Sequence, residues 1–239
     1  MTKRLSLIAL LFISLLSACS DDDSGPYQCK DCVDQPEANA AYNSSAAGIY
    51  KGAVVGSSGT IKFDFANSST TIIGVLEIDR KTVTLTTTAT LNANGFLGSF
   101  TGTLDGAAVA IQVTVSNTGV LTIGTVTIPG HPNPIFSIYK EKSNQIVKVF
   151  EGTYSGDDSG IFNMVIRFNE NGSGAWYAIS RRSAEITDSF FQGEVSAEGV
   201  MVGGGGKVVV AGSLEGDVIS GEWEDTDDLS GSWRGKRTL

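Results

Sequence analysis

The stretch Ser159-Gly160-Ile161-Phe162-Asn163-Met164-Val165-Ile166-Arg167-Phe168 decides the fold, because the chain carries a counterpart of it in Ser58-Gly59-Thr60-Ile61-Lys62-Phe63-Asp64-Phe65. In both stretches every second residue is apolar. A period of two places those side chains on one face of a β-strand, against a core, and their neighbours on the other face. The sequence therefore predicts the same strand twice.

Other matches surround this pair and keep the same order along the chain. Gly48-Ile49-Tyr50-Lys51-Gly52 matches Gly152-Thr153-Tyr154-Ser155-Gly156, Phe96-Leu97-Gly98 matches Phe191-Gln192-Gly193, Leu104-Asp105-Gly106 matches Ala197-Glu198-Gly199, and Ser137-Ile138-Tyr139-Lys140 matches Ser232-Trp233-Arg234. Collinear matches of this kind indicate an internal repeat. We predict two related units over residues 48–142 and 151–239, joined by residues 143–150.

Each unit has the composition of an antiparallel β-meander. Alternation recurs in Val109, Ile111, Val113 and Val115, and turn pairs such as Asn171-Gly172 separate the alternating runs. No stretch after residue 18 shows a helical period. We predict an all-β protein with about eight short strands per unit, each unit a small barrel or strongly curved sheet that hides its edges. A β-sandwich or one merged sheet is the alternative.

The first residues have the layout of a secretory signal peptide over residues 1–18. Lys3-Arg4 precedes an apolar run from Leu5 to Leu16. A helix of that run would reach only about 18 Å, short of the roughly 30 Å hydrocarbon core of a bilayer. The run is therefore predicted to direct export and not to span a membrane.

The end of this segment, Leu16-Ser17-Ala18-Cys19, resembles the lipobox of bacterial lipoproteins. The resemblance implies that Cys19 carries a lipid, with acyl chains such as palmitate, and anchors the protein in a membrane. Ser20-Asp21-Asp22-Asp23 is similar to the export tag of surface-displayed lipoproteins in Gram-negative bacteria. It implies an outer-membrane protein facing the cell exterior, with the periplasmic face as the alternative. The globular part resembles no family of known function.

The charge and the cysteines limit the possible partners. The net charge of -9 argues against nucleic acid, because no basic patch would release counterions. Residues 19–47 read as an acidic, solvated tether that contains Cys29 and Cys32. In an oxidising compartment these two cysteines are expected to form a local disulfide, with free thiols, metal binding or redox chemistry as alternatives.

Few residues offer chemistry. His131 lies in a proline-rich loop and is expected to be structural. The run Gly203–Gly206 before Lys207 is expected to form a bulge or mobile hairpin tip. A phosphate-binding loop would need Ser or Thr directly after the lysine, where this chain has Val208. The one metal candidate is a calcium site, for which a solvated acidic turn is the alternative. It consists of Glu222, Glu224, Asp225, Asp227 and Asp228.

These observations favour a non-enzymatic binding or interaction module that binds an unknown extracellular ligand or protein. The alternative is a carboxylate-dependent hydrolase of extracellular polymer, which would need two acids converging in a cleft. Aromatic residues gather in the second unit, where they either pack in the core or face a ligand: Trp176, Tyr177, Phe190, Phe191, Trp223 and Trp233.

Overall fold

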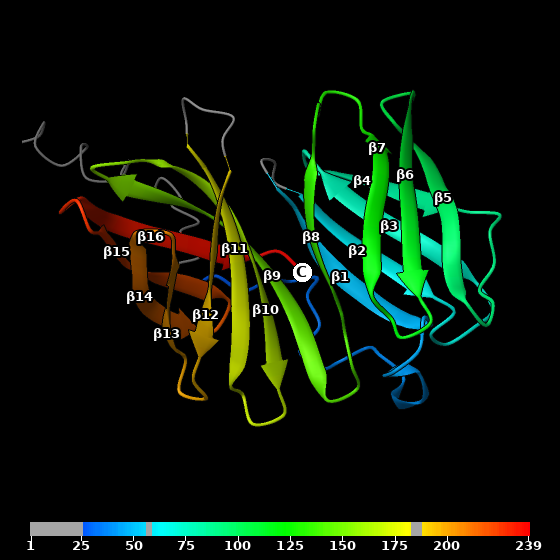
Figure 1. The fold of residues 1–239 in the computed structure, drawn as a ribbon, viewed down its shortest axis with the longest axis horizontal. Coiled ribbons are helices and arrows are strands. Elements are labelled where there is room, and N and C mark those ends of the chain that lie inside the picture. The colour runs from blue at the N-terminus through cyan, green and yellow to red at the C-terminus, as the bar shows by residue number, and fades with distance from the viewer. Residues whose placement is uncertain (1–25, 56–58, 183–187) are drawn as a thin grey trace, which may run out of the picture.

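A computed structural model of the chain describes residues 26–55, 59–182 and 188–239, which fold almost entirely as β-strands (Figure 1). A short 3-10 helix, η1 (Ala40–Tyr42), precedes them. The first unit consists of β1 (Gly48–Val55), β2 (Gly59–Phe65), β3 (Ile72–Ile78), β4 (Lys81–Thr86), β5 (Gly95–Leu104), β6 (Ala107–Ser116), β7 (Leu121–Thr127) and β8 (Ile135–Lys140). The second consists of β9 (Gln145–Gly156), β10 (Gly160–Asn169), β11 (Gly174–Arg182), β12 (Asp188–Val195), β13 (Val200–Gly205), β14 (Val208–Glu215), β15 (Val218–Asp225) and β16 (Ser230–Arg237).

The two units have the same antiparallel topology but differ in closure. The second unit is a closed barrel in which β9 pairs with both β10 and β16. The first unit is an eight-stranded sheet in the order β7-β6-β5-β4-β3-β2-β1-β8, which curves into a nearly closed barrel. The predicted all-β fold of two tandem meander units is confirmed.

Phenylalanines fill the interior of the first barrel. Phe63, Phe65, Phe96 and Phe100 are at most 2% exposed, and their ring centroids lie 4.6–5.9 Å apart. Rings at these distances in tilted and edge-on arrangements form a dense apolar core. The alternation that predicts β2 places Phe63 and Phe65 there.

The junction between the units is a strand and not the linker expected at residues 143–150. β9 begins at Gln145 and pairs with β10 from Gln145 to Tyr154. Ile146 and Phe150 face the interior of the second barrel, whereas Val147 and Val149 pack with Ala53 of the first unit. Because both faces of β9 are covered here, its sequence lacks the alternation that marks a half-buried strand.

The N-terminal segment lies against both units. Where the sequence suggests a solvated tether over 19–47, residues 26–47 are in contact with the barrels, and residues 19–25, which include Cys19 and the export tag, lie outside the described residues. At the second unit, the Tyr27 hydroxyl donates to the Arg237 carbonyl at 2.7 Å. At the first, Glu37 pairs with Lys51 at 2.9 Å and with Lys62 at 2.5 Å.

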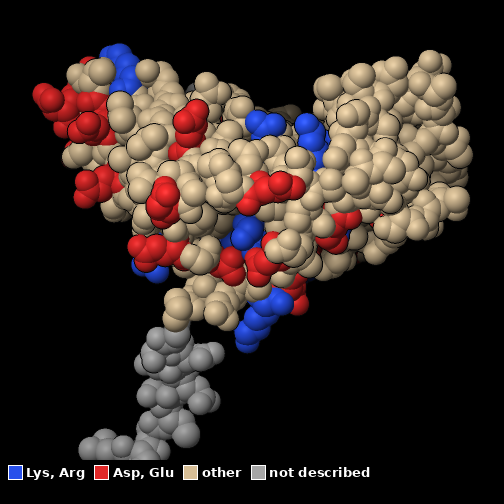
Figure 2. Space-filling model, turned by 90° about the horizontal axis from the view of Figure 1, so that it is seen from below, with Lys and Arg blue, Asp and Glu red and all other residues tan. Residues whose placement is uncertain are grey.

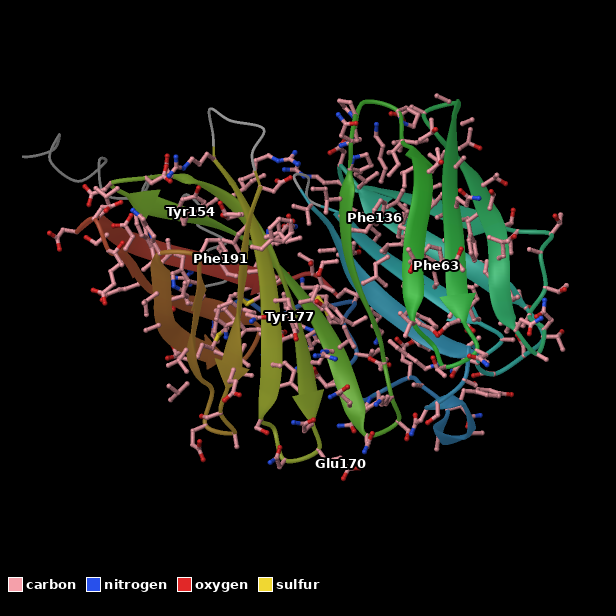
Figure 3. The ribbon with its side chains drawn as sticks, viewed as in Figure 1. Phe63, Phe136, Tyr154, Glu170, Tyr177 and Phe191 are labelled. Atoms are coloured by element: carbon pink, nitrogen blue, oxygen red, sulfur yellow. A yellow bond between two sulfur atoms is a disulfide. The ribbon has the colours of Figure 1, made fainter. Side chains whose placement is uncertain are left out.

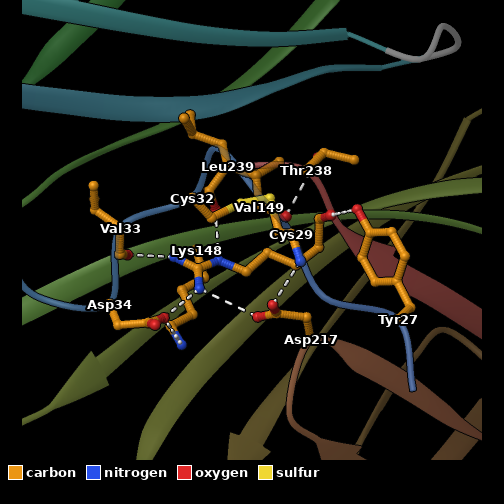
Figure 4. Close-up of a disulfide and its surroundings, with 11 residues drawn as sticks. Tyr27, Cys29, Cys32, Val33, Asp34, Lys148, Val149, Asp217, Thr238 and Leu239 are labelled. Carbon is orange, nitrogen blue, oxygen red and sulfur yellow. Dashed lines mark hydrogen bonds and ion pairs between the residues drawn. A yellow bond between two sulfur atoms is a disulfide. The ribbon is translucent and has the colours of Figure 1, made fainter. Parts of the chain in front are cut away.

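A disulfide joins Cys29 to Cys32 in this segment (Figure 4). The Cys29 amide donates to the Asp217 carboxylate at 2.9 Å, and the buried Arg237 guanidinium contacts Asp217, Asp34 and the Val33 carbonyl. Charged groups this well hydrogen-bonded fix the segment in place. No helix in the described part of the chain is long and apolar enough to cross a membrane.

Candidate functional site

The interior of the second barrel contains a cavity of about 130 Å³. It lies where β9, β11 and β15 end and where β10, β12, β14 and β16 begin, and Figure 3 shows Tyr154 and Phe191 in this barrel. An apolar cavity of roughly 150 Å³ can hold benzene or xenon. The space therefore matches one aromatic ring or a short hydrocarbon chain. Its aromatic lining residues are Tyr154, Phe162, Trp176, Phe191, Trp223 and Trp233.

All three tryptophans of the chain line this cavity. Trp176, Trp223 and Trp233 are at most 9% exposed, and each indole N–H donates to a backbone carbonyl of the barrel wall at 3.1–3.3 Å. Indole has no other hydrogen-bonding atom. The rings are thus held in fixed positions, and their remaining surface is apolar.

Glycines in the neighbouring strands make room for these rings. A Cβ at Gly203 would lie 2.4 Å from the Trp176 ring, and one at Gly212 would lie 2.4 Å from the Trp233 ring. This differs from the bulge or mobile hairpin tip expected at Gly203–Gly206. Residues 203–205 belong to β13, and only Gly206, with φ of 60°, lies in the turn. The glycines serve close packing of an indole on backbone.

The rim of the cavity is polar. Asp158 accepts from Arg182 Nε at 2.7 Å, and Asp225 accepts from the backbone amides of Asp227 and Leu229 at 2.8 and 3.0 Å. Burial, reinforced by the Asp158 carboxylate, raises the pKa of Tyr154, so this phenol stays protonated. The cavity is therefore apolar inside and polar at its mouth.

The predicted calcium ligands do not converge. Alternation along β15 leaves Glu222 and Glu224 exposed on the outer face, while Asp225 lines the cavity and Asp227 pairs with Lys207 at 3.0 Å. Asp228 occupies the turn with φ of 62°. Within residues 26–55, 59–182 and 188–239, no three His, Cys, Asp or Glu side chains are placed to hold a metal ion.

The other sequence candidates separate into two sets. His131 lies in the β7–β8 connection, where its Nε2 is 2.8 Å from Asp79. Of the aromatic residues in question, Tyr177 and Phe190 face outward, whereas Phe191 and the tryptophans face the cavity. The glycines opposite the tryptophans are the sequence signal that could have identified this cavity. A large ring on one strand packs against a residue without a side chain on a neighbouring strand.

The comparisons with known proteins do not add to this geometry. The chain matches no family model, no curated protein and no solved structure.

Proposed function

We propose that the chain is a lipid-anchored extracytoplasmic binding protein, not an enzyme, whose second barrel takes up the apolar end of a small amphiphilic molecule. The cavity lined by Trp176, Trp223 and Trp233 carries this proposal. Ligand sites in proteins are concave and mostly apolar, with a few polar groups that orient the ligand. The second barrel has that arrangement, whereas phenylalanine rings fill the first.

The shape and chemistry of the cavity define the class of ligand. Its apolar volume suits a single aromatic ring or a short acyl chain. Ser180, Ser189 and the Asp158–Arg182 pair lie at the mouth, where they offer hydrogen bonds to a polar end of the ligand. The proposed ligand is therefore a small amphiphile that enters with its apolar end first.

The hydrolase alternative receives less support from the same rim. Asp158 and Asp225 both line the cavity, but the first is paired with Arg182 and the second accepts two backbone amides of its own turn. A general acid or base needs a carboxyl group that is free to exchange a proton with a substrate. Both carboxylates are already engaged in these hydrogen bonds.

Tryptophan fluorescence tests the ligand site directly, because every tryptophan of the protein lines the cavity. The mature chain from Cys19, carrying Cys19→Ser to prevent lipid attachment, is titrated with 4-methylphenol and with hexanoate. Saturable changes in emission are expected. The matched control is Ala178→Leu, which fills the cavity and leaves the rim intact. Equal titrations of both proteins, or no saturable change, would contradict the proposal.

The proposed location, anchored by lipid in the outer membrane and facing the cell exterior, is inferred from residues 16–23 and is tested separately. Cys19→Ala should abolish labelling of the protein by radioactive palmitate in cells, and persistent labelling would refute lipid attachment at Cys19. Protease added to whole cells should degrade the protein if it faces the exterior. Degradation only after the outer membrane is permeabilised would place it on the periplasmic face.

A further inference from the structure

The first barrel has an open seam that the second lacks. β7 and β8 are the two edge strands of its sheet, whereas the corresponding β15 and β16 pair from Val218–Lys236 to Glu224–Ser230. Residues 226–229 connect β15 to β16. Residues 128–134 connect β7 to β8 and contain three prolines, which lack the backbone N–H that a strand ladder needs. The two units therefore differ in the pairing of their seventh and eighth strands, which is present in the second unit and absent in the first.

Core side chains along the seam are left partly uncovered. The inward-facing apolar residues of β7 and β8 remain partly exposed, although Ile61, Leu76 and Ile111 in the same core are fully buried. The partly exposed set is Leu121, Ile123, Val126, Phe136 and Ile138. Burying more of this surface would stabilise the protein, because it removes apolar area from water. An added strand with inward-facing apolar side chains would bury it.

The edge of β8 is a regular template for such a strand. β8 pairs with β1 at six consecutive positions, and the next amide, Glu141 N, donates to Ile49 O at 2.9 Å. Since backbone groups alternate in direction along a strand, residues 135, 137 and 139 also point to β1. The N–H and C=O groups of Phe136, Ile138 and Lys140 therefore point to the free edge. In contrast, a register shift interrupts β7.

This edge borders a groove of about 440 Å³. Residues 135–139 form one wall, and the outer face of the second barrel, with Tyr177 and Phe190, forms the other. Phe190 is 63% exposed. In Figure 2 a notch separates the two bodies, with Lys or Arg atoms at its edge. The groove thus offers a backbone ladder on one side and aromatic side chains on the other.

Arg167 lies beside the groove, in contact with Tyr139 and Tyr177. The Arg167 guanidinium stacks 4.9 Å from the Tyr139 ring and 5.3 Å from the Tyr177 ring, and the two rings are 5.1 Å apart. Its Nη2 donates to the Tyr177 hydroxyl at 3.4 Å, whereas its Nε is buried and has no hydrogen-bond partner within the described part of the chain. No carboxylate of the described residues forms an ion pair with Arg167. An acidic group on a ligand would complement this charge.

We infer that the groove binds an extended polypeptide segment of a partner protein, which adds to β8 as a further strand. Main-chain hydrogen bonds to β8 supply affinity in this mode, and alternate side chains supply specificity. Inward-facing apolar side chains of the segment cover the open core, outward-facing ones contact Tyr177 and Phe190, and an acidic residue pairs with Arg167. This site is independent of the proposed cavity ligand.

Selection from a random peptide library tests the inference. The mature chain carrying Cys19→Ser is immobilised, and the enriched peptides are expected to alternate apolar and polar residues, to contain an acidic residue and to lack proline in the paired stretch. Ile138→Pro removes one free-edge N–H and should weaken binding at least tenfold relative to Ile138→Ala, which loses the same side chain but keeps the N–H. Absence of enrichment, or equal binding by both variants, would overturn the inference.

Amide hydrogen exchange on the unsubstituted protein supplies a readout that does not depend on how the variants fold. The enriched peptide should slow exchange at Phe136, Ile138 and Lys140, while the amides of residues 135, 137 and 139 are already slow. Protection confined to other strands would refute strand addition at β8. Protection of the same amides that rises with concentration of the chain alone would make the occupant a second copy, which also overturns the inference.

Discussion

Leucine at position 178 should stabilise the second barrel. Ala178 lines the cavity and is 6% exposed, so its side chain faces space that no other atom occupies. Three added carbons, each with roughly the 30 Å³ of a water molecule, fit within the cavity of about 130 Å³. Burial of about 0.8 kcal/mol per CH₂, reduced by about 1 kcal/mol of side-chain entropy, leaves a gain of about 1 kcal/mol in the free energy of unfolding.

The matched control lies in the filled barrel. Val113 is fully buried in the first core, and Val113→Leu has no space to enter. Overpacking of this kind costs about 1–3 kcal/mol, so the two enlargements should change stability in opposite directions. Urea unfolding followed by circular dichroism measures both barrels, and tryptophan emission follows the second alone. If Ala178→Leu destabilises as much as Val113→Leu, the second barrel is not hollow and the reasoning fails.

Three further changes test the contacts that hold the units and the N-terminal segment together. Glu141→Ala leaves the buried Lys51 without its 2.8 Å partner, so the free energy of unfolding in urea should fall by about 3 kcal/mol, and a change within experimental error would show that Glu37 suffices. Arg237→Met removes the guanidinium that contacts Asp34, Asp217 and the Val33 carbonyl, so limited proteolysis should cut residues 26–34 first, whereas unchanged resistance would contradict the anchoring role. Burial lowers the pKa of Lys140 from 10.5 to about 8, so the unfolded chain binds more protons than the folded one between these two pH values, and stability should rise from about pH 8 to about pH 10.5. Lys140→Met should flatten this rise in the urea midpoint, and parallel profiles for the two proteins would refute the assignment.

The repeat predicts most of the fold because its signal is periodic. Phe63 and Phe65 in β2 alternate with the less buried Lys62 and Asp64, since this strand has one face in the core of the first barrel. The signal fails at β9, where Val147 and Val149 face the other unit and Ile146 and Phe150 face the barrel. Only the second barrel closes, because β15 pairs with β16 whereas β7 and β8 remain edge strands. The prolines between β7 and β8 are visible in the sequence, but they do not show whether the two strands pair.

The sequence predicts the candidate site only in part. Aromatic residues in the second unit are visible in the chain, but their direction depends on strand register, which places Phe191 inward and its neighbour Phe190 outward. The acidic residues between 222 and 228 predict a calcium site because they are adjacent in sequence. Alternation on β15 then separates Glu224 from Asp225. A cavity arises from side chains that meet across strands, so spacing within one strand does not reveal it.

Xenon in crystals tests most directly whether the second barrel is hollow and apolar. Xenon occupies apolar cavities of this size and needs no polar partner. A xenon atom is expected among Trp176, Trp223 and Trp233, in the cavity of about 130 Å³, and none among the phenylalanine rings of the first barrel. A second barrel that takes up no xenon, or a first barrel that takes up as much, would contradict the account.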